Sequence, residues 1–187
     1  MRSFLLVAGL LVSGAFAIAQ ENTTPVVEVG VNYSLVRYRS SQDLQDFTQN
    51  GGSGYFEYNL NRVVGLVGDF GGYYNGTNSF KTFSYLGGPR FNLRRSKFNP
   101  YVQFLFGGTK RWADVVATDG TIVTTDQTGF TTAAGGGLDI ALTHHIAVKP
   151  VQLEYVMSQL PMLGTSTNTI QNNLRYSAGV VLRFGGK

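Results

Sequence analysis

The last strand-like segment of the chain, residues 173–184, reads NLRYSAGVVLRF. Apolar or aromatic residues alternate there with polar or small ones, and a period of two is typical of a β-strand whose two faces meet different surroundings. One face is apolar throughout, whereas the other carries Arg175 and Arg183. This pattern constrains the fold more than any other feature, because a continuous apolar face has to be covered by something.

The same alternation recurs in seven earlier segments of the chain. Together with the last segment it predicts eight strands, over residues 26–37, 52–60, 63–74, 81–93, 100–110, 130–142, 146–156 and 173–184. The connections at 61–62, 94–99 and 143–145 are tight, whereas those at 38–51, 75–80, 111–129 and 157–171 include the long, polar ones. An even number of strands places both termini at the end of the tight turns.

The first nineteen residues read as a secretory signal peptide. Arg2 supplies a positive start, residues 4–16 form an apolar run, and Ala17-Ile18-Ala19 matches a small-x-small cleavage site. We therefore expect two segments, a signal peptide over 1–19 and one domain over 20–187. No later segment has the run of about 20 apolar residues that a membrane helix needs.

Composition excludes several classes of protein. The chain contains no cysteine, so a disulfide scaffold or a thiolate metal site is excluded. Removal of Arg2 with the signal peptide lowers the net charge of +4 by one, to +3, which is too weak to imply nucleic-acid binding. Charged residues make up 14% of the chain, below the roughly 25% of soluble domains. No cofactor is expected.

Together these features predict an all-β fold, an eight-stranded antiparallel up-and-down transmembrane β-barrel. Short turns at one end, longer loops at the other and strands of about ten residues are typical of bacterial outer-membrane barrels. In such a barrel the apolar face contacts lipid and the polar face lines the lumen. The alternative is a soluble periplasmic barrel binding an apolar ligand, which would have its aromatic residues inside and Arg90 and Arg175 outside.

Charged residues on the polar face are the first candidate site. They are expected to form a lumenal charge network, because an unpaired charge in a narrow barrel costs several kcal/mol. Antiparallel geometry predicts that Glu154 pairs with Arg175 and Glu28 with Arg183. The full set is Glu28, Glu57, Asp69, Arg90, Asp139, Glu154, Arg175 and Arg183.

Basic residues where the strands meet the longer loops are the second candidate site. They are either ordinary solvated rim residues or contacts to the phosphates of an outer-leaflet glycolipid. The set is Arg37, Arg39, Lys81, Lys110 and Arg111. Aromatic residues are expected to form two girdles, an outer one of Tyr33, Tyr38, Tyr74, Phe83, Trp112, Phe130 and Tyr176 and an inner one of Tyr58, Phe91, Phe98, Tyr101 and Phe184.

Two local features stand apart from this scheme. In residues 146–156 the alternation puts Lys149 on the lipid face, where its side chain would extend to the membrane interface. Alternatively, Pro150 marks a bulge that reverses the phase of the strand. His144 and His145 lie on a tight turn, and adjacent strand residues face opposite sides, so a metal site is not predicted.

Several segments resemble a known family. YLGGPRF, NPYVQFLFGG, AAGGGLDIAL and LRYSAGVVLRF are similar to segments of small outer-membrane β-barrel domains of the OmpA and OmpX type. The resemblance implies outer-membrane localisation, contact with lipid and recognition of the final strand by the barrel assembly machinery. Here residues 185–187 follow Phe184, whereas related barrels end on the aromatic residue.

The resemblance implies a non-enzymatic barrel without a wide pore, with a role in envelope integrity, adhesion or surface interaction. An outer-membrane lipid-modifying enzyme is the alternative. It would need a cluster of His with Ser or a carboxylate in the outer half, and the two histidines are expected at the opposite end.

Overall fold

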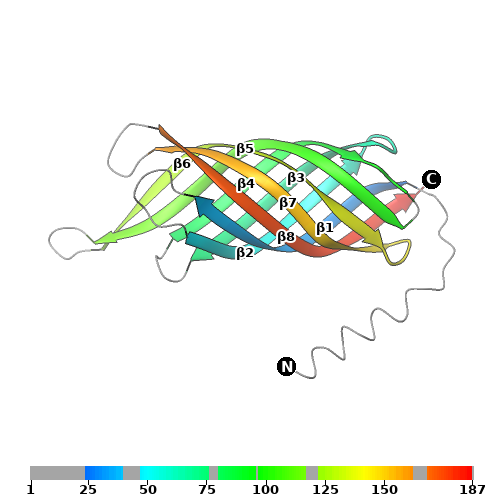
Figure 1. The fold of residues 1–187 in the computed structure, drawn as a ribbon, viewed down its shortest axis with the longest axis horizontal. Helices are drawn as coiled ribbons and strands as arrows, with labels where there is room; N and C mark the ends of the chain where they lie inside the picture. The colour runs from blue at the N-terminus through cyan, green and yellow to red at the C-terminus, as the bar shows by residue number, and fades with distance from the viewer. Residues whose placement is uncertain are drawn as a thin grey trace, which may run out of the picture.

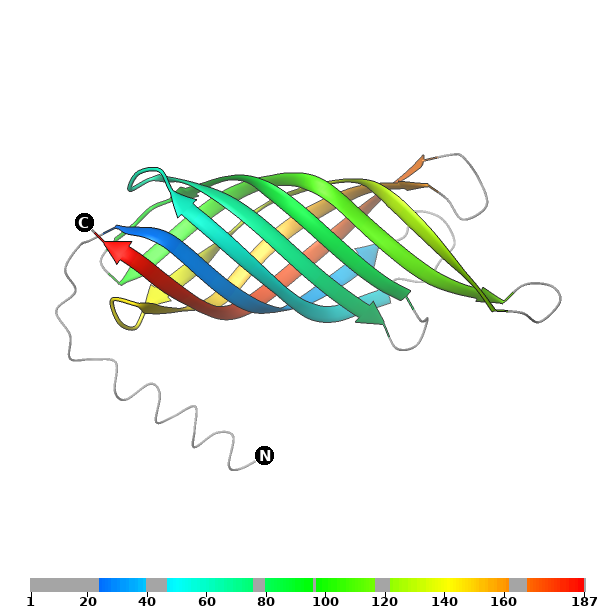
Figure 2. The ribbon, with the colours of Figure 1, turned by 180° about the vertical axis from the view of Figure 1, so that it is seen from behind.

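The computed structural model describes residues 24–39, 47–75, 80–95, 97–116, 122–161 and 168–186. They form eight antiparallel strands that close into one barrel, each strand pairing with its neighbours in the sequence and the first with the last (Figures 1 and 2). The strands are β1 (Pro25–Arg39), β2 (Phe47–Asn59), β3 (Val64–Asn75), β4 (Phe80–Asn92), β5 (Phe98–Val116), β6 (Ile122–Ala141), β7 (Ile146–Pro161) and β8 (Asn168–Gly186). The predicted fold class is confirmed.

No helix in the described part of the chain is long and apolar enough to cross a membrane. The predicted signal peptide over 1–19 lies outside the described residues.

The predicted strands are correct in number and order, but most of them end too early at the long-loop end. Strand β2 begins at Phe47, inside the predicted loop 38–51, and β5 and β6 occupy most of the predicted loop 111–129, pairing as far as Val116 and Ile122. Strands β7 and β8 likewise extend into the predicted loop 157–171. Beyond the bilayer both faces of a strand meet water, so the period-two signal fades although the backbone pairing continues.

The apolar side chains face outward, as the transmembrane prediction requires. In β8, Tyr176 is 40% exposed and Phe184 49% exposed, whereas Arg175 and Arg183, which precede them, are 2% and 8% exposed. The same alternation is found in the other strands: Phe56 of β2 and Phe104 of β5 are 47% and 51% exposed. A soluble barrel would need the reverse arrangement.

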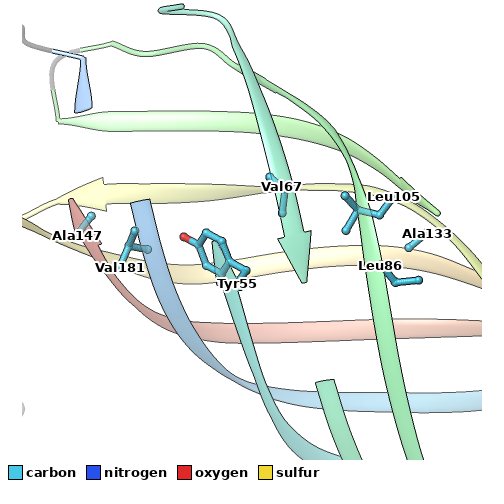
Figure 3. Packing of buried hydrophobic residues seen from close by; sticks show 7 residues of the cluster. All are labelled: Tyr55, Val67, Leu86, Leu105, Ala133, Ala147 and Val181. Atoms are coloured by element: carbon cyan, nitrogen blue, oxygen red, sulfur yellow. The ribbon is translucent and has the colours of Figure 1, made fainter. Parts of the chain in front are cut away.

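The lumen is filled by side chains, as expected for a barrel of eight strands. A small apolar cluster lies inside, shown in Figure 3, and comprises Tyr55, Val67, Leu86, Leu105, Ala133, Ala147 and Val181. Polar and charged residues occupy most of the remaining inward positions.

Glycine makes room for the tyrosine rings inside the lumen. Gly30 of β1 is paired with Tyr55 of β2, and a Cβ at Gly30 would lie 2.2 Å from the Tyr55 ring. Tyr101 of β5 has the same relation to its partner Gly137 of β6, where a Cβ would lie 2.5 Å from the phenol oxygen. Each ring therefore lies over the backbone of the neighbouring strand, which only glycine permits.

Candidate functional site: the charged lumen and the two rims

With the exception of Asp139, the predicted lumenal charges form a connected network. All eight predicted members are buried, each at most 8% exposed. In its outer half, Glu154 and Arg175 are register partners on β7 and β8, with 2.7 Å between Arg175 Nε and Glu154 Oε2. Arg175 Nη1 also donates to Asp69 Oδ1 and to Tyr73 Oη, both at 2.8 Å. One guanidinium thus joins β8 to β3 and β7 across the barrel.

The middle of the lumen is organised around Arg90. Its Nη1 is 2.7 Å from Glu57 Oε2, and its Nε donates to Gln103 Oε1 at 2.9 Å. The guanidinium carbon lies 4.8 Å from the ring centroid of Tyr55 and 4.1 Å from that of Tyr101. Cation–π contacts with two aromatic rings and an ion pair with one carboxylate together satisfy this buried charge.

The short-turn end of the lumen contains Glu28. Its register partner is Arg183, with 3.5 Å between Arg183 Nε and Glu28 Oε2. The shorter ion pair is made with Arg94, whose Nη2 is 2.5 Å from Glu28 Oε1. The sequence predicts Arg94 in the turn at 94–99, and nothing in the spacing of the residues indicates that its side chain folds back into the lumen.

Lys149 is a further lumenal cation. It is 1% exposed, and the β7 register shifts between Lys149 and Gln152, so Pro150 lies in a bulge that reverses the phase. The bulge alternative is therefore correct. Lys149 Nζ donates to Gln152 Oε1 at 3.0 Å and lies 3.8 Å from the ring centroid of Tyr55.

Asp139 is the remaining carboxylate of the lumen. It is fully buried, and neither of its oxygens has a hydrogen-bond partner among the described residues. A buried carboxylate of this kind needs water or a nearby cation. No direct ion pair to Asp139 occurs in the described part of the chain.

Charge is nearly balanced inside the barrel. The lumenal carboxylates of the described residues are Glu28, Glu57, Asp69, Asp139 and Glu154, and the lumenal cations are Arg90, Arg94, Arg111, Lys149, Arg175 and Arg183. One cavity of about 20 Å³ lies in the outer half, beside Arg175 and Thr82, and has room for about one water molecule. This arrangement links strands across the lumen and leaves no wide pore along the described strands.

The predicted outer rim divides into two groups. Arg37 and Lys81 are exposed, and Lys110 is half-buried, with its Nζ 2.8 Å from Asp126 Oδ2 and 5.3 Å from the ring centroid of Trp112. The side chain of Arg39 lies outside the described residues. The prediction that Arg111 lies on the outer rim is wrong. Arg111 is 7% exposed, and its Nη2 donates to Gln171 Oε1 at 3.0 Å. Strand β5 keeps its alternation there, so Arg111 shares the lumenal side with Gln103.

The predicted girdles lie at the two ends of the outer surface, with one correction. Tyr33, Tyr74 and Phe130 are exposed near one end, and Tyr58, Phe91, Phe98 and Phe184 near the other. Tyr101 does not belong to the inner girdle, because it is 3% exposed and lies in the lumen. The side chain of Tyr38 lies outside the described residues.

The two histidines lie on the exposed turn between β6 and β7, at the short-turn end. Their rings contact each other edge to face, with centroids 4.8 Å apart. No group of three or more potential metal ligands occurs among the described residues.

Comparison with known proteins agrees with this architecture. The outer membrane protein beta-barrel domain family matches residues 3–184. The chain belongs to this family. It is therefore an integral protein of the bacterial outer membrane, and its apolar outer surface contacts lipid. No curated protein sequence matches the chain.

Solved structures share the fold of this outer-membrane barrel. Neisserial surface protein A is 17% identical, with a TM-score of 0.69 over 88% of this chain and 100% of that one. Ail, the attachment invasion locus protein of Yersinia pestis, is 17% identical, with a TM-score of 0.62 over 84% of this chain and 97% of that one. A second structure of Ail, in complex with the heparin analogue sucrose octasulfate, has a TM-score of 0.55 at 16% identity, covering 84% of this chain and 99% of that one.

Proposed function

We propose that this protein is a non-enzymatic surface-interaction barrel whose outer end binds anionic groups, in particular the phosphates of an outer-leaflet glycolipid. The observation that carries the proposal is the charge on the outward surface near that end. Arg37, Lys81 and Lys110 point away from the lumen there, and Asp126 is the one described side chain with a carboxylate beside them. Polybasic surfaces of this kind attract phosphate and sulfate groups.

The projecting part of β5 and β6 supports an interaction at this end. We call residues 113–116 and 122–129 the β5–β6 ribbon. Its two strands pair with each other, but none of its residues pairs with a described residue of β4 or β7. Figure 2 shows it extending beyond the ends of the other strands. The complex of Ail with a sulfated sugar is a precedent, on the same fold, for binding a polyanion.

The absence of an enzymatic activity is part of the proposal. A lipid-modifying enzyme of the outer leaflet would need an acid–base pair in the outer half of the barrel. His144 and His145 lie instead on the turn at the opposite end. Four of the five described lumenal acids, Glu28, Glu57, Asp69 and Glu154, are paired with cations from other parts of the chain, as a structural network requires.

Insertion by the barrel assembly machinery is also proposed. Strand β8 ends with exposed apolar side chains at Leu182 and Phe184, 45% and 49% exposed. An aromatic residue near the end of the last strand is the feature that this machinery is expected to read. Replacement of Phe184 by Ser is expected to lower the amount of folded protein in the outer membrane.

Two experiments test the proposal in sequence. The outer-membrane fraction of cells expressing the full chain is first run in SDS with and without boiling, and a mobility shift is expected from a closed barrel. Binding of a phosphorylated outer-leaflet glycolipid to the purified barrel in micelles is then compared between wild type and the K81Q/K110Q variant. We expect at least about tenfold weaker binding for the variant, because the loss of even one hydrogen bond to a charged group costs about 1.5–3 kcal/mol.

The control variant is H144D/H145D, which lowers the formal net charge by the same amount, two, on the exposed turn at the opposite end of the barrel. It should bind the glycolipid as wild type does. Equal weakening of both variants would show a general effect of net charge, and unchanged binding by K81Q/K110Q would reject the outer rim as the binding surface.

A further inference from the structure

Carboxylates are scarce on the outside of the barrel. Among the side chains that the structure describes, Glu28, Glu57, Asp69, Asp139 and Glu154 are buried in the lumen. The sixth, Asp126, is exposed in the β5–β6 ribbon at the long-loop end. At the short-turn end the exposed charges of the described residues are therefore positive.

Two arginines at this end lie on neighbouring turns. Arg62 is in the turn between β2 and β3, Arg95 is in the turn between β4 and β5, and both are exposed. Arg62 Nη2 donates to the carbonyl oxygen of Arg94 at 3.2 Å. The guanidinium of Arg62 thus lies within one peptide unit of Arg95. This bond uses one of the five N–H donors of Arg62, so the others are available to a ligand.

Both turns are held in place by their own hydrogen bonds. Asn61 Oδ1 accepts from the backbone N–H groups of Val63 and Val64, each at 2.8 Å. In the second turn, Arg95 N donates to Phe98 O at 3.0 Å, and Phe98 N donates to Arg95 O at 2.8 Å. The backbone that carries the two arginines is therefore fixed before any ligand binds, which lowers the entropic cost of binding.

Apolar side chains surround the two arginines on the outer surface. Leu60 and Val63 flank Arg62 and are 56% and 48% exposed, while Leu93 and Phe98 flank Arg95 and are 65% and 55% exposed. These residues continue the lipid-facing surface to the very end of the barrel. The two arginines therefore lie where the apolar surface ends, which is the depth of phospholipid headgroups.

We propose that Arg62 and Arg95 form a binding site for the phosphate of an anionic glycerophospholipid in the leaflet at the short-turn end. Guanidinium groups bind phosphate oxygens through paired, charge-assisted hydrogen bonds. The acyl chains lie along Leu60, Val63 and Leu93. Arg94, on the same turn as Arg95, forms an ion pair with Glu28 in the lumen and does not contribute to the phosphate site.

The site is independent of the function proposed for the outer rim, because it lies at the other end of the barrel and needs only membrane insertion. Its test uses the folded full-length mature barrel in micelles of a nonionic maltoside detergent, which carries no phosphate. Short-chain phosphatidylglycerol is added in steps, and backbone amide NMR shifts are followed. We expect saturable shifts confined to residues 60–63 and 93–98, and about tenfold weaker binding in the R62Q/R95Q variant.

The barrel provides its own control. The turn at 142–145 lies at the same end and contains no lysine or arginine, and it is closed by similar hydrogen bonds that Thr143 Oγ1 accepts from the backbone N–H groups of His145 and Ile146. Its amides should not shift, and short-chain phosphatidylcholine should shift neither region. The R62K/R95K variant keeps the charge without the planar fork and should bind with intermediate strength.

Three results would overturn the proposal. Equal shifts at residues 142–145 would show general accumulation of lipid, and equal effects of the two lipids would show no preference for the anionic headgroup. Equal shifts with inorganic phosphate alone would show an anion site that does not recognise lipid. Binding by wild type that is confined to the two turns and specific for phosphatidylglycerol supports the site even where a variant fails to fold.

Discussion

Lys149 and Tyr55 stack inside the barrel, with the ammonium nitrogen 3.8 Å from the ring centroid. The contact joins β7 to β2 across the lumen, and it exists because the Pro150 bulge turns Lys149 inward. A cation over an aromatic face in a site without water contributes about 2 kcal/mol. The bulge therefore converts an otherwise lipid-exposed charge into a link between opposite walls.

Replacement of Lys149 by Met is expected to destabilise the barrel by about 2 kcal/mol, the magnitude of a desolvated cation–π contact. The substitution also leaves Gln152 Oε1 without this donor. Urea unfolding in micelles, followed by fluorescence of Trp112, the single tryptophan of the chain, measures the effect. Lys81→Met, at an exposed rim position, is the matched control, and equal midpoints for the two variants would contradict a lumenal role for Lys149.

The ion pair between Glu154 and Arg175 gives a second prediction. Removing one partner of a buried pair leaves an uncompensated charge and costs about 3–5 kcal/mol. Arg175→Met, which leaves both Glu154 and Asp69 without their cation, should lower the free energy of unfolding by about this amount. Glu154→Gln should cost less, because Asp69 still pairs with Arg175, and the double variant should cost less than the sum of the two single variants. Strictly additive losses in the same urea experiment would show that the two side chains do not interact in the folded barrel.

The sequence was sufficient for the strand order and for part of the network. Glu154 and Arg175 lie on strands joined by one hairpin, so counting residues back from the connection placed them opposite each other. The pairing of Glu28 with Arg183 followed from closure of β1 on β8. In both cases the alternation is unbroken between the turn and the charged residue.

Residues that the sequence misplaced or left undecided lie where the alternation breaks or has no contrast. For Lys149 two alternatives stayed open, because it precedes a bulge and a single extra residue reverses every later position. Arg111 follows Lys110, and two adjacent cations give the two faces the same character. Arg94 lies in a turn, and its side chain reaches Glu28 by folding back, which no periodicity encodes.

Close packing of Tyr55 over Gly30 gives a third prediction. A Cβ at Gly30 would lie 2.2 Å from the ring, so Gly30→Ala must displace it and is expected to cost about 1–3 kcal/mol. Gly72→Ala is the matched control, since a Cβ there would meet no atom within 4 Å, and its effect should be about 0.5 kcal/mol or less. The cost of Gly30→Ala should largely disappear in a Tyr55→Ala background. A cost that persists there would mean that the backbone of β1, and not the ring, rejects the side chain.

The ion pair of Asp126 with Lys110 in the outer part of β5 and β6 gives a prediction about pH. The hydrogen bond from Lys110 and its positive charge lower the pKa of Asp126 below the ordinary value. Because the folded pKa is the lower one, the contribution of this pair to stability is present above the unfolded pKa and is lost as the pH falls through the folded pKa. The Asp126 side chain is 59% exposed and that of Lys110 38% exposed, so added salt should weaken the contribution of the ion pair. The carboxyl ¹³C shift of Asp126 should titrate below its ordinary range in wild type and return to that range in Lys110→Met. Identical titration curves for the two proteins would show that the pair does not persist in solution.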